Sequence, residues 1–224
     1  ISDRIREPVA TSLMMRYASR DDVLIDAGAN IGYFSLVLSD RVHEIHAIEP
    51  DKANYKTLQK NIELNTAKNI LTYNIALSDS DQPVFLERAG KSNWHRTLKR
   101  EKADACSTKA ITLDAFCADR DIRPTLMKMD IEGFEKYVIA GAKDSLAGLR
   151  YLFFELHSSF LTIPETNGIL DILDATPLKL EHIIRYDRPG LWIEEPLSLI
   201  DSVRLGDFGI YELIYARPTN QIHN

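Results

Sequence analysis

The stretch "LIDAGANIGYFSL" (residues 24–36) joins an apolar run to a helical pattern through a turn with two glycines and an asparagine. Gly28 and Gly32 permit a tight turn and the close approach of a ligand, and free amides at the start of the next helix favour a carboxylate or phosphate. A dinucleotide-binding fingerprint also needs glycine at positions 30 and 33, which hold Asn30 and Tyr33. The acidic residue beside the turn, Asp26, favours a cationic ligand over a pyrophosphate.

Short apolar runs alternate with helical patterns along the rest of the chain. We expect strands at 22–28, 44–50, 69–79, 124–133, 151–157, 178–187 and 208–218, and helices after 31, 51, 134 and 165. Residues 87–109 are polar and read as a long surface loop, and 188–207 show no clear helix. This order predicts an α/β fold with a doubly wound, mostly parallel sheet. Ligands of such sheets bind at the carboxyl ends of the strands, where the winding reverses between the first and fourth strands.

The overall composition narrows the class of protein. With 224 residues and 45% hydrophobic content, the chain is expected to form one domain, 1–224. It begins at Ile1, so an excised domain and a trimmed chain both remain open. A net charge of -6 without a basic block argues against nucleic acid, and no apolar run is long enough to span a membrane. We expect a cytoplasmic protein with two reduced cysteines, and the sequence leaves its oligomeric state open.

Glu49 ends the second predicted strand, 21 residues after Gly28 (49 minus 28). This is the spacing at which a carboxylate accepts the hydroxyls of a ribose. The alternative is a helix-entry carboxylate beside Pro50 that is favoured by the helix dipole. Together with the glycine turn, the spacing favours the ribose role.

Charged residues also follow the fourth and fifth predicted strands. Lys128, Asp130 and Glu132 alternate along "KMDIEG" and share one face, and Glu155 and His157 share one side of "FFELH". Three charged groups on a covered strand are costly without partners or a function. We expect these residues to meet at the cleft, as a functional site or as an internal ion-pair network around Lys128.

Several motifs together resemble the FkbM-type methyltransferases, a branch of the class I S-adenosylmethionine-dependent enzymes. They are "VLIDAGANIGYFSL", "AIEP", "ALSD", "TLDAF", "KMDIEGFE" and "FELH", between about residues 23 and 157. The resemblance implies a Rossmann-like seven-stranded fold with an antiparallel last strand, and O-methylation of sugars, polyketides or related hydroxylated metabolites. It places the methionine part of S-adenosylmethionine across the turn, the ribose on Glu49 and the adenine near the third strand. The implied cofactor-binding residues are Asp26, Gly28, Asn30, Gly32, Glu49, Ser78, Asp79 and Asp130.

Methyl transfer to a hydroxyl needs alignment and a group that takes the proton. We expect Asp130 to line the methyl site and His157 to be the general base, because a neutral imidazole works near neutral pH. Glu132 and Glu155 then orient these groups. We prefer a metal-free site, and the alternative is a divalent cation on Asp130, Glu132 and Glu155.

The acceptor is expected to be a small molecule or glycan. Trp94 and His95 of the polar segment are candidates to contact it, together with Lys128. Two other functions are alternatives to methyl transfer. An NAD-dependent or nucleotide-sugar-dependent oxidoreductase is disfavoured by the broken glycine fingerprint, and a non-catalytic cofactor-binding module by the presence of Asp26, Glu49 and Asp130.

Overall fold

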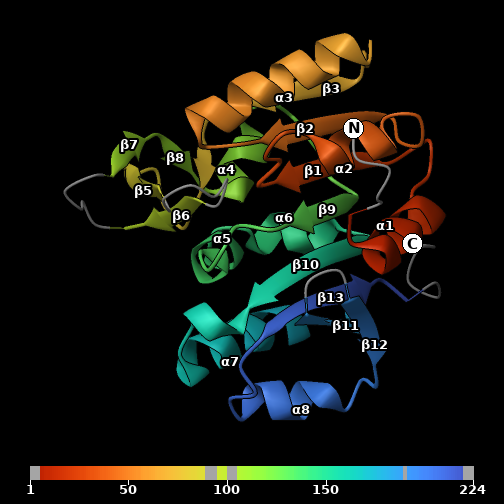
Figure 1. Ribbon diagram of the computed structural model, residues 1–224, viewed down its shortest axis with the longest axis vertical. Helices are drawn as coiled ribbons and strands as arrows, with labels where there is room; N and C mark the ends of the chain where they lie inside the picture. The colour runs from red at the N-terminus through yellow and green to blue at the C-terminus, as the bar shows by residue number, and fades with distance from the viewer. Residues whose placement is uncertain (1–5, 89–94, 100–104, 189–190, 219–224) are drawn as a thin grey trace.

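The computed structural model describes residues 6–88, 95–99, 105–188 and 191–218. Its main sheet has eight strands in the order β12-β11-β13-β10-β9-β1-β2-β3 (Figure 1). Neighbours from β3 to β10 run parallel, and β13 runs antiparallel to both β10 and β11. The strands are β1 (Val23–Ala27), β2 (Glu44–Ile48), β3 (Ile70–Tyr73), β9 (Leu126–Met129), β10 (Tyr151–His157), β11 (Lys179–Arg188), β12 (Leu191–Glu195) and β13 (Ile210–Ala216). The predicted doubly wound sheet and its antiparallel last strand are confirmed, and β12 adds an eighth strand at the edge.

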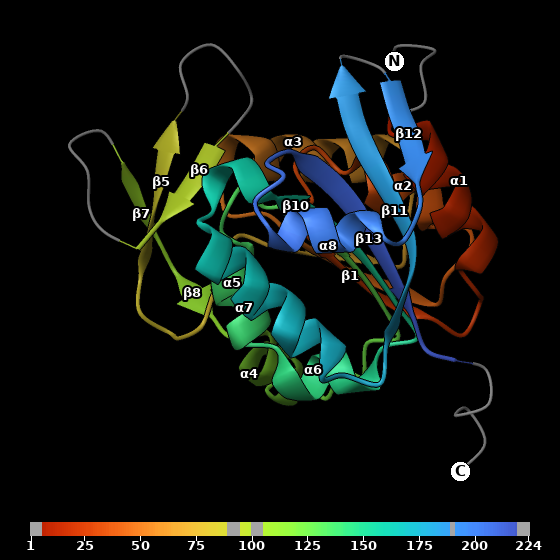
Figure 2. The same cartoon turned by 90° about the horizontal axis from the view of Figure 1, so that it is seen from below.

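Helices cover both faces of this sheet (Figure 2). On one face, Phe34 and Met14 pack with Leu24 and Phe153 of the sheet. The other face carries a larger core that includes Val138, Ile139, Ala142 and Leu146, which recur at helical spacing. The helices of the first face are α1 (Pro8–Tyr17), α2 (Tyr33–Leu38) and α3 (Lys52–Leu64). Those of the second are α4 (Leu113–Ala118), α5 (Glu135–Ala140), α6 (Lys143–Gly148), α7 (Ile163–Asp174) and α8 (Leu199–Arg204).

Local signals set several helix ends. Asp51 caps α3, because its Oδ1 accepts the backbone amides of Ala53 at 2.8 Å and Asn54 at 2.9 Å. The helix expected over 134–149 is instead divided, and α5 ends at Gly141. Gly141 lies so close to the backbone at Ser78 that an added Cβ would be 2.3 Å from the Ser78 carbonyl oxygen. The division of the helix therefore lets this segment pack against the end of β4.

Two predictions between residues 69 and 111 need correction. The single strand expected at 69–79 is broken into β3 and β4 (Ala76–Leu77), and β4 pairs with β8 (Ala110–Ile111) outside the main sheet. The polar segment 87–109, read as a loop, contains the end of β5 (Val84–Arg88) and all of β6 (His95–Leu98) and β7 (Cys106–Thr108), which form a small sheet. The buried apolar residues of β5, Val84 and Leu86, alternate over too short a run to give a strand signal. Figure 1 shows this small sheet beside the carboxyl ends of the parallel strands.

The structure also contains elements that the sequence did not predict near both ends of the described chain. The helix α1 packs on the face of α2, while β12 and α8 fill the segment 188–207. Cys106 and Cys117 are both free thiols. None of the described helices is long and apolar enough to span a bilayer.

Candidate active site

The glycine turn lies directly after β1 and is shaped by the protein's own backbone. Gly28 has a φ of 78°, and a Cβ there would lie 1.9 Å from the carbonyl oxygen of Asp130. The Gly28 and Ala29 amides donate to the Ile48 carbonyl, and the Asn30 amide donates to Glu49. The prediction of a tight turn is confirmed, but these three amides have partners within the protein. The turn therefore offers none of these three amides to an anion, whereas the expectation for the amides at the start of the next helix concerns other residues and stays a prediction.

Glu49 joins this turn to the start of α3. Its Oε2 accepts the Asn30 amide at 2.8 Å, and its Oε1 accepts the Asp51 amide at 2.8 Å. The side chain is buried, and burial raises the pKa of Glu49 to about 7, although the two backbone hydrogen bonds partly oppose this. A side-chain hydrogen bond from Asn54 takes a further acceptor site, so the carboxylate holds the turn and keeps one site open for a ligand hydroxyl.

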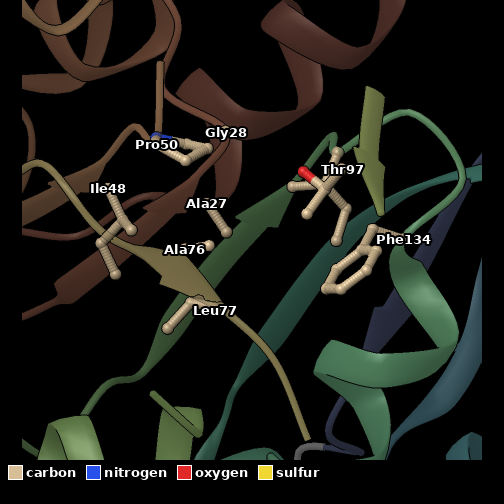
Figure 3. A pocket seen from close by; sticks show the side chains of 9 residues that line it. Ala27, Gly28, Ile48, Pro50, Ala76, Leu77, Thr97 and Phe134 are labelled. Atoms are coloured by element: carbon tan, nitrogen blue, oxygen red, sulfur yellow. The ribbon is translucent and has the colours of Figure 1, made fainter. Parts of the chain in front are cut away.

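A small pocket lies beside the turn (Figure 3). Most of its lining is apolar, and the only polar side chain among the lining residues is that of Thr97 from β6. Figure 3 shows Thr97 and Phe134 on one side, and Ile48, Ala27 and Leu77 on another. The pocket therefore lies between the carboxyl ends of β1 and β2, strand β4 and the small sheet. Its lining residues are Ala27, Gly28, Ile48, Pro50, Ala76, Leu77, Thr97, Ile131 and Phe134.

Ser78 and Asp79 follow the pocket residue Leu77. Lys99 donates to the Ser78 hydroxyl at 2.8 Å and forms an ion pair with Asp79. Although partial burial opposes it, the contact with Lys99 holds the pKa of Asp79 below its usual value. The predicted pair therefore lies next to the pocket, where Lys99 joins it to the small sheet.

A row of polar side chains crosses the sheet on the face that α1 and α2 cover. Asp26 and Lys128 are register partners on β1 and β9, and Glu155 and Glu212 are partners on β10 and β13. Glu7, just before α1, is also buried, and one oxygen of each of Glu7, Glu155 and Glu212 lies within 4.8 Å of the others. The predicted meeting of charged residues from neighbouring strands is confirmed, and it extends to two more carboxylates.

Asp26 has a different role from the predicted one. It is 1% exposed, and its Oδ2 accepts the Ser35 hydroxyl of α2 at 2.5 Å. Burial raises the pKa of Asp26, because the ionised form is shielded from water. A ligand cannot reach this carboxylate without moving α2. Asp26 therefore stabilises the packing of α2 against β1 beside the turn.

Lys128 lies at the centre of the polar row. Its Nζ is 3.6 Å from Asp130 Oδ2 and 3.6 Å from Glu155 Oε2, and it lies 4.9 Å from the Phe34 ring centroid. Burial alone would lower the pKa of Lys128, but Asp130 and Glu212 raise it well above its usual value. The side chain is only 1% exposed, so the expected contact between Lys128 and a substrate is replaced by a role in balancing buried charge.

Carboxylates surround both nitrogens of His157. Nδ1 is 2.7 Å from Glu135 Oε1, while Nε2 faces Glu132 Oε2 at 3.2 Å, Glu155 Oε1 at 3.5 Å and Asp130 Oδ1 at 3.9 Å. Burial opposes the charged ring, but Glu135 and the other carboxylates raise the pKa of His157 to about 10. The surrounding carboxylates therefore favour the charged form of the ring. This weighs against His157 as a neutral imidazole base, and its catalytic role stays a prediction.

The other two predicted catalytic carboxylates differ in their access to solvent. The Glu132 side chain is 24% exposed, and that of Glu155 is 8% exposed. Burial raises the pKa of Glu132 to about 6, and burial together with Asp130 raises the pKa of Glu155 well above its usual value. Of this pair, Glu132 is therefore the better placed to meet an entering ligand.

Several site residues lay outside the sequence-based set. Glu7 and Glu135 carry no periodic signal, whereas Glu212 is a lone acid inside the apolar strand "IYELIYA", a signal that could have identified it. The substrate candidate Trp94 lies outside the described residues. His95 begins β6, but its side chain lies outside the described part of the chain.

This sheet order, with the antiparallel β13, is the Rossmann-like fold of class I methyltransferases. A solved methyltransferase FkbM from Methylobacillus flagellatus KT matches it with a TM-score of 0.59 and 19% identity, over 92% of this chain and 47% of that one. A putative methyltransferase from Streptococcus mutans, solved in complex with SAH, matches with a TM-score of 0.54 and 10% identity, over 96% and 100% of the two chains.

The model of the Methyltransferase FkbM domain matches residues 26–178, and the chain belongs to this family. The hexuronic acid methyltransferase AglP of Haloferax volcanii is 25% identical over 159 residues, which are 70% of this chain and 65% of that protein. Methyltransferase 1 of Beauveria bassiana is 25% identical over 148 residues, which are 55% of this chain and 59% of that protein. The chain thus spans less than two thirds of the length of either relative.

Proposed function

We propose that this chain is an S-adenosylmethionine-dependent O-methyltransferase that acts on a hydroxyl of a sugar, a glycan or a related hydroxylated metabolite. One observation carries the proposal. The apolar pocket beside Gly28 and the carboxylates around Asp130 lie at the same edge of the sheet. Family membership supports methyl transfer, and the relative named as a hexuronic acid methyltransferase supports a sugar acceptor.

The residues around the pocket suit a nucleoside. Ile48, Leu77 and Phe134 offer apolar surface to a purine, and Ser78 with Asp79 follows directly at the end we assign to adenine. Glu49 keeps an acceptor site for a ribose hydroxyl. Asn30 and the turn around Gly28 would then lie along the amino acid portion of the cofactor.

When bound, S-adenosylmethionine supplies an activated methyl group on a sulfonium centre. The protein then has to align the acceptor hydroxyl, exclude water and take up a proton. Asp130 is the group we assign to the methyl site, because its carbonyl meets the Gly28 turn while its carboxylate faces the cluster.

We assign the proton acceptor to Glu132 in place of His157. The Glu132 side chain is partly exposed, and its Oε2 faces His157 Nε2 at 3.2 Å but forms no hydrogen bond among the described residues. His157 is 1% exposed, and its two nitrogens face Glu135 and three further carboxylates. His157 and Glu155 therefore serve to position Asp130 and Glu132.

Calorimetry with S-adenosylhomocysteine and NADH tests the cofactor. We expect the first ligand to bind and the second not to bind. Glu49→Gln should weaken S-adenosylhomocysteine by about tenfold or more, because the amide offers fewer acceptor sites to the ribose. Glu63→Gln, on the exposed surface of α3, is the matched control. Binding of NADH alone would instead favour the oxidoreductase function.

Transfer of a labelled methyl group to uronic-acid glycans and other polyols tests the reaction. A hexuronic acid offers both hydroxyl and carboxyl oxygens, and alkali cleaves a methyl ester but leaves a methyl ether. We expect an alkali-stable product. Glu132→Gln should lower the rate about 10²- to 10⁴-fold with S-adenosylhomocysteine affinity unchanged. A protein that binds the cofactor but transfers no label to any acceptor would be the non-catalytic module.

A further inference from the structure

We propose that Asp130, Glu155 and His157 form a binding site for a divalent transition-metal cation such as Mn²⁺. These are residues of β10 and of the turn after β9. One ligand atom from each lies within 4.8 Å of the other two. This ligand set differs from the carboxylates of Asp130, Glu132 and Glu155 considered in the sequence analysis, because an imidazole nitrogen takes the place of the Glu132 carboxylate.

The distances around His157 Nε2 fit ligands that share an ion. Nε2 lies 3.5 Å from Glu155 Oε1 and 3.9 Å from Asp130 Oδ1. Ligands about 2.1 Å from one cation are separated by about 3.0 Å in octahedral and about 3.4 Å in tetrahedral geometry. A direct charged hydrogen bond would instead be about 2.7 to 2.9 Å long. Nε2 is therefore farther from Glu155 Oε1 and Asp130 Oδ1 than in a direct charged hydrogen bond, at spacings close to those of a coordination shell, while Glu132 Oε2 lies nearer, at 3.2 Å.

The opposite nitrogen of the ring provides an independent indication. Nδ1 is 2.7 Å from Glu135 Oε1, and that oxygen also accepts the Gly133 amide at 2.9 Å. Metal-binding histidines commonly donate their second nitrogen to a carboxylate, which fixes the ring and turns the other lone pair toward the ion. Glu135 is fully buried and so holds the ring in one orientation.

Unpartnered polar atoms point to the same place. Asp130 Oδ1 is buried and has no hydrogen-bond partner among the described residues, and it is the atom that faces Nε2. The second oxygens of Asp130 and Glu155 lie 3.6 Å from Lys128 Nζ. Each carboxylate thus turns one oxygen to Lys128 and the other to His157.

The donor set indicates the kind of ion. Imidazole with two carboxylates suits Mn²⁺, Fe²⁺ or Zn²⁺ better than Ca²⁺ or Mg²⁺, which prefer oxygen ligands alone. Three protein ligands leave positions open for water or substrate, as in catalytic sites. If the proposed function holds, an acceptor hydroxyl takes an open position, and the ion makes its proton easier to remove.

A second group of carboxylates competes for the same ion. Glu7, Glu155 and Glu212 also bring one oxygen each within 4.8 Å of one another. This group has no nitrogen donor, and all three of its members are buried. Asp130, by contrast, has a side chain that is 23% exposed, so the proposed site has a route to solvent.

Titration of the chelator-treated full chain with MnCl₂, followed by electron paramagnetic resonance, tests the site. We expect one ion per chain and the spin-echo modulation that an imidazole nitrogen imparts. His157→Gln should abolish that modulation and weaken Mn²⁺ by more than about a hundredfold, and Glu135→Gln should weaken it by about ten- to a hundredfold. Asp130→Asn should also weaken it strongly. Glu212→Gln is the matched control and should leave binding unchanged.

Thermal melts of each variant identify any that fail to fold. The variants that fold then test whether the ion binds at the proposed site. The proposal is overturned if Mn²⁺ does not bind at millimolar concentration, or if the bound ion shows no imidazole modulation. Loss of binding in Glu212→Gln but not in His157→Gln would overturn it in favour of the second carboxylate group. S-adenosylhomocysteine binding measured in chelator stands apart from these outcomes, so failure of the metal site and failure of the proposed function can be distinguished.

Discussion

The buried carboxyl group of Glu49 should make the stability of the protein depend on pH. Its pKa is raised from 4.5 to about 7, mainly by burial. Between these two values the folded protein holds a proton that the unfolded chain releases. The stabilisation is therefore present at about pH 4.5 and is lost as the pH rises through 7.

The size of the effect follows from the shift of the pKa. A shift from 4.5 to about 7 corresponds to about 3 kcal/mol, and about 2 to 3 kcal/mol of this falls between pH 5 and pH 8. Glu49→Gln removes the titration. The variant also loses an acceptor for the Asn30 or Asp51 amide, but that cost does not depend on pH.

Urea denaturation of the chelator-treated protein at pH 5 and pH 8 measures the change in the free energy of unfolding between the two pH values. On going from pH 5 to pH 8, the wild type should lose about 2 to 3 kcal/mol more unfolding free energy than Glu49→Gln. Glu63→Gln, changed on an exposed surface, should follow the wild type. An equal loss in the wild type and Glu49→Gln would refute the reasoning.

Three further predictions concern the turn, a helix cap and the buried cation. Gly28→Ala should lower the melting temperature sharply, because the added Cβ overlaps the Asp130 carbonyl; Gly28→Asn, which tolerates the positive φ, should not restore it. Asp51→Ala should cost about 1 kcal/mol in urea denaturation, and Asp51→Ser should recover most of that. Lys128→Met should cost about 3 to 5 kcal/mol at pH 8, because Asp130 and Glu155 lose their cation; the loss should shrink at pH 5, and an equal loss at both pH values would contradict this account.

The sequence predicts well those features that depend on local pattern. The apolar runs of β1, β2, β9 and β10, the Asp51 cap and the stripe of Val138 and Ile139 all have their signal within a few residues. The acidic carboxyl edge was also predictable, because alternation on a strand assigns side chains to faces.

The sequence does not predict features that depend on long-range pairing. The small sheet β5–β6–β7 is too short and polar to show alternation, so it read as a loop. The partnership of Glu155 with Glu212 is set by the register of β10 with β13. The protonation of His157 depends on Glu135 and three other carboxylates, which meet only after folding.

The walls of the pocket differ in how firmly they are held. Ala27 and Gly28 belong to β1 and its turn, and β1 is paired along both edges, whereas Thr97 belongs to a short strand of the small sheet. The β4–β8 pairing beside that sheet spans only two residue pairs. If the proposed function holds, a bound nucleoside would therefore lie between a wall with extensive backbone pairing and a wall with little. The alignment of the cofactor would then depend on the wall formed by β1 and its turn. The rate at which the cofactor binds and leaves would depend on the wall that contains Thr97.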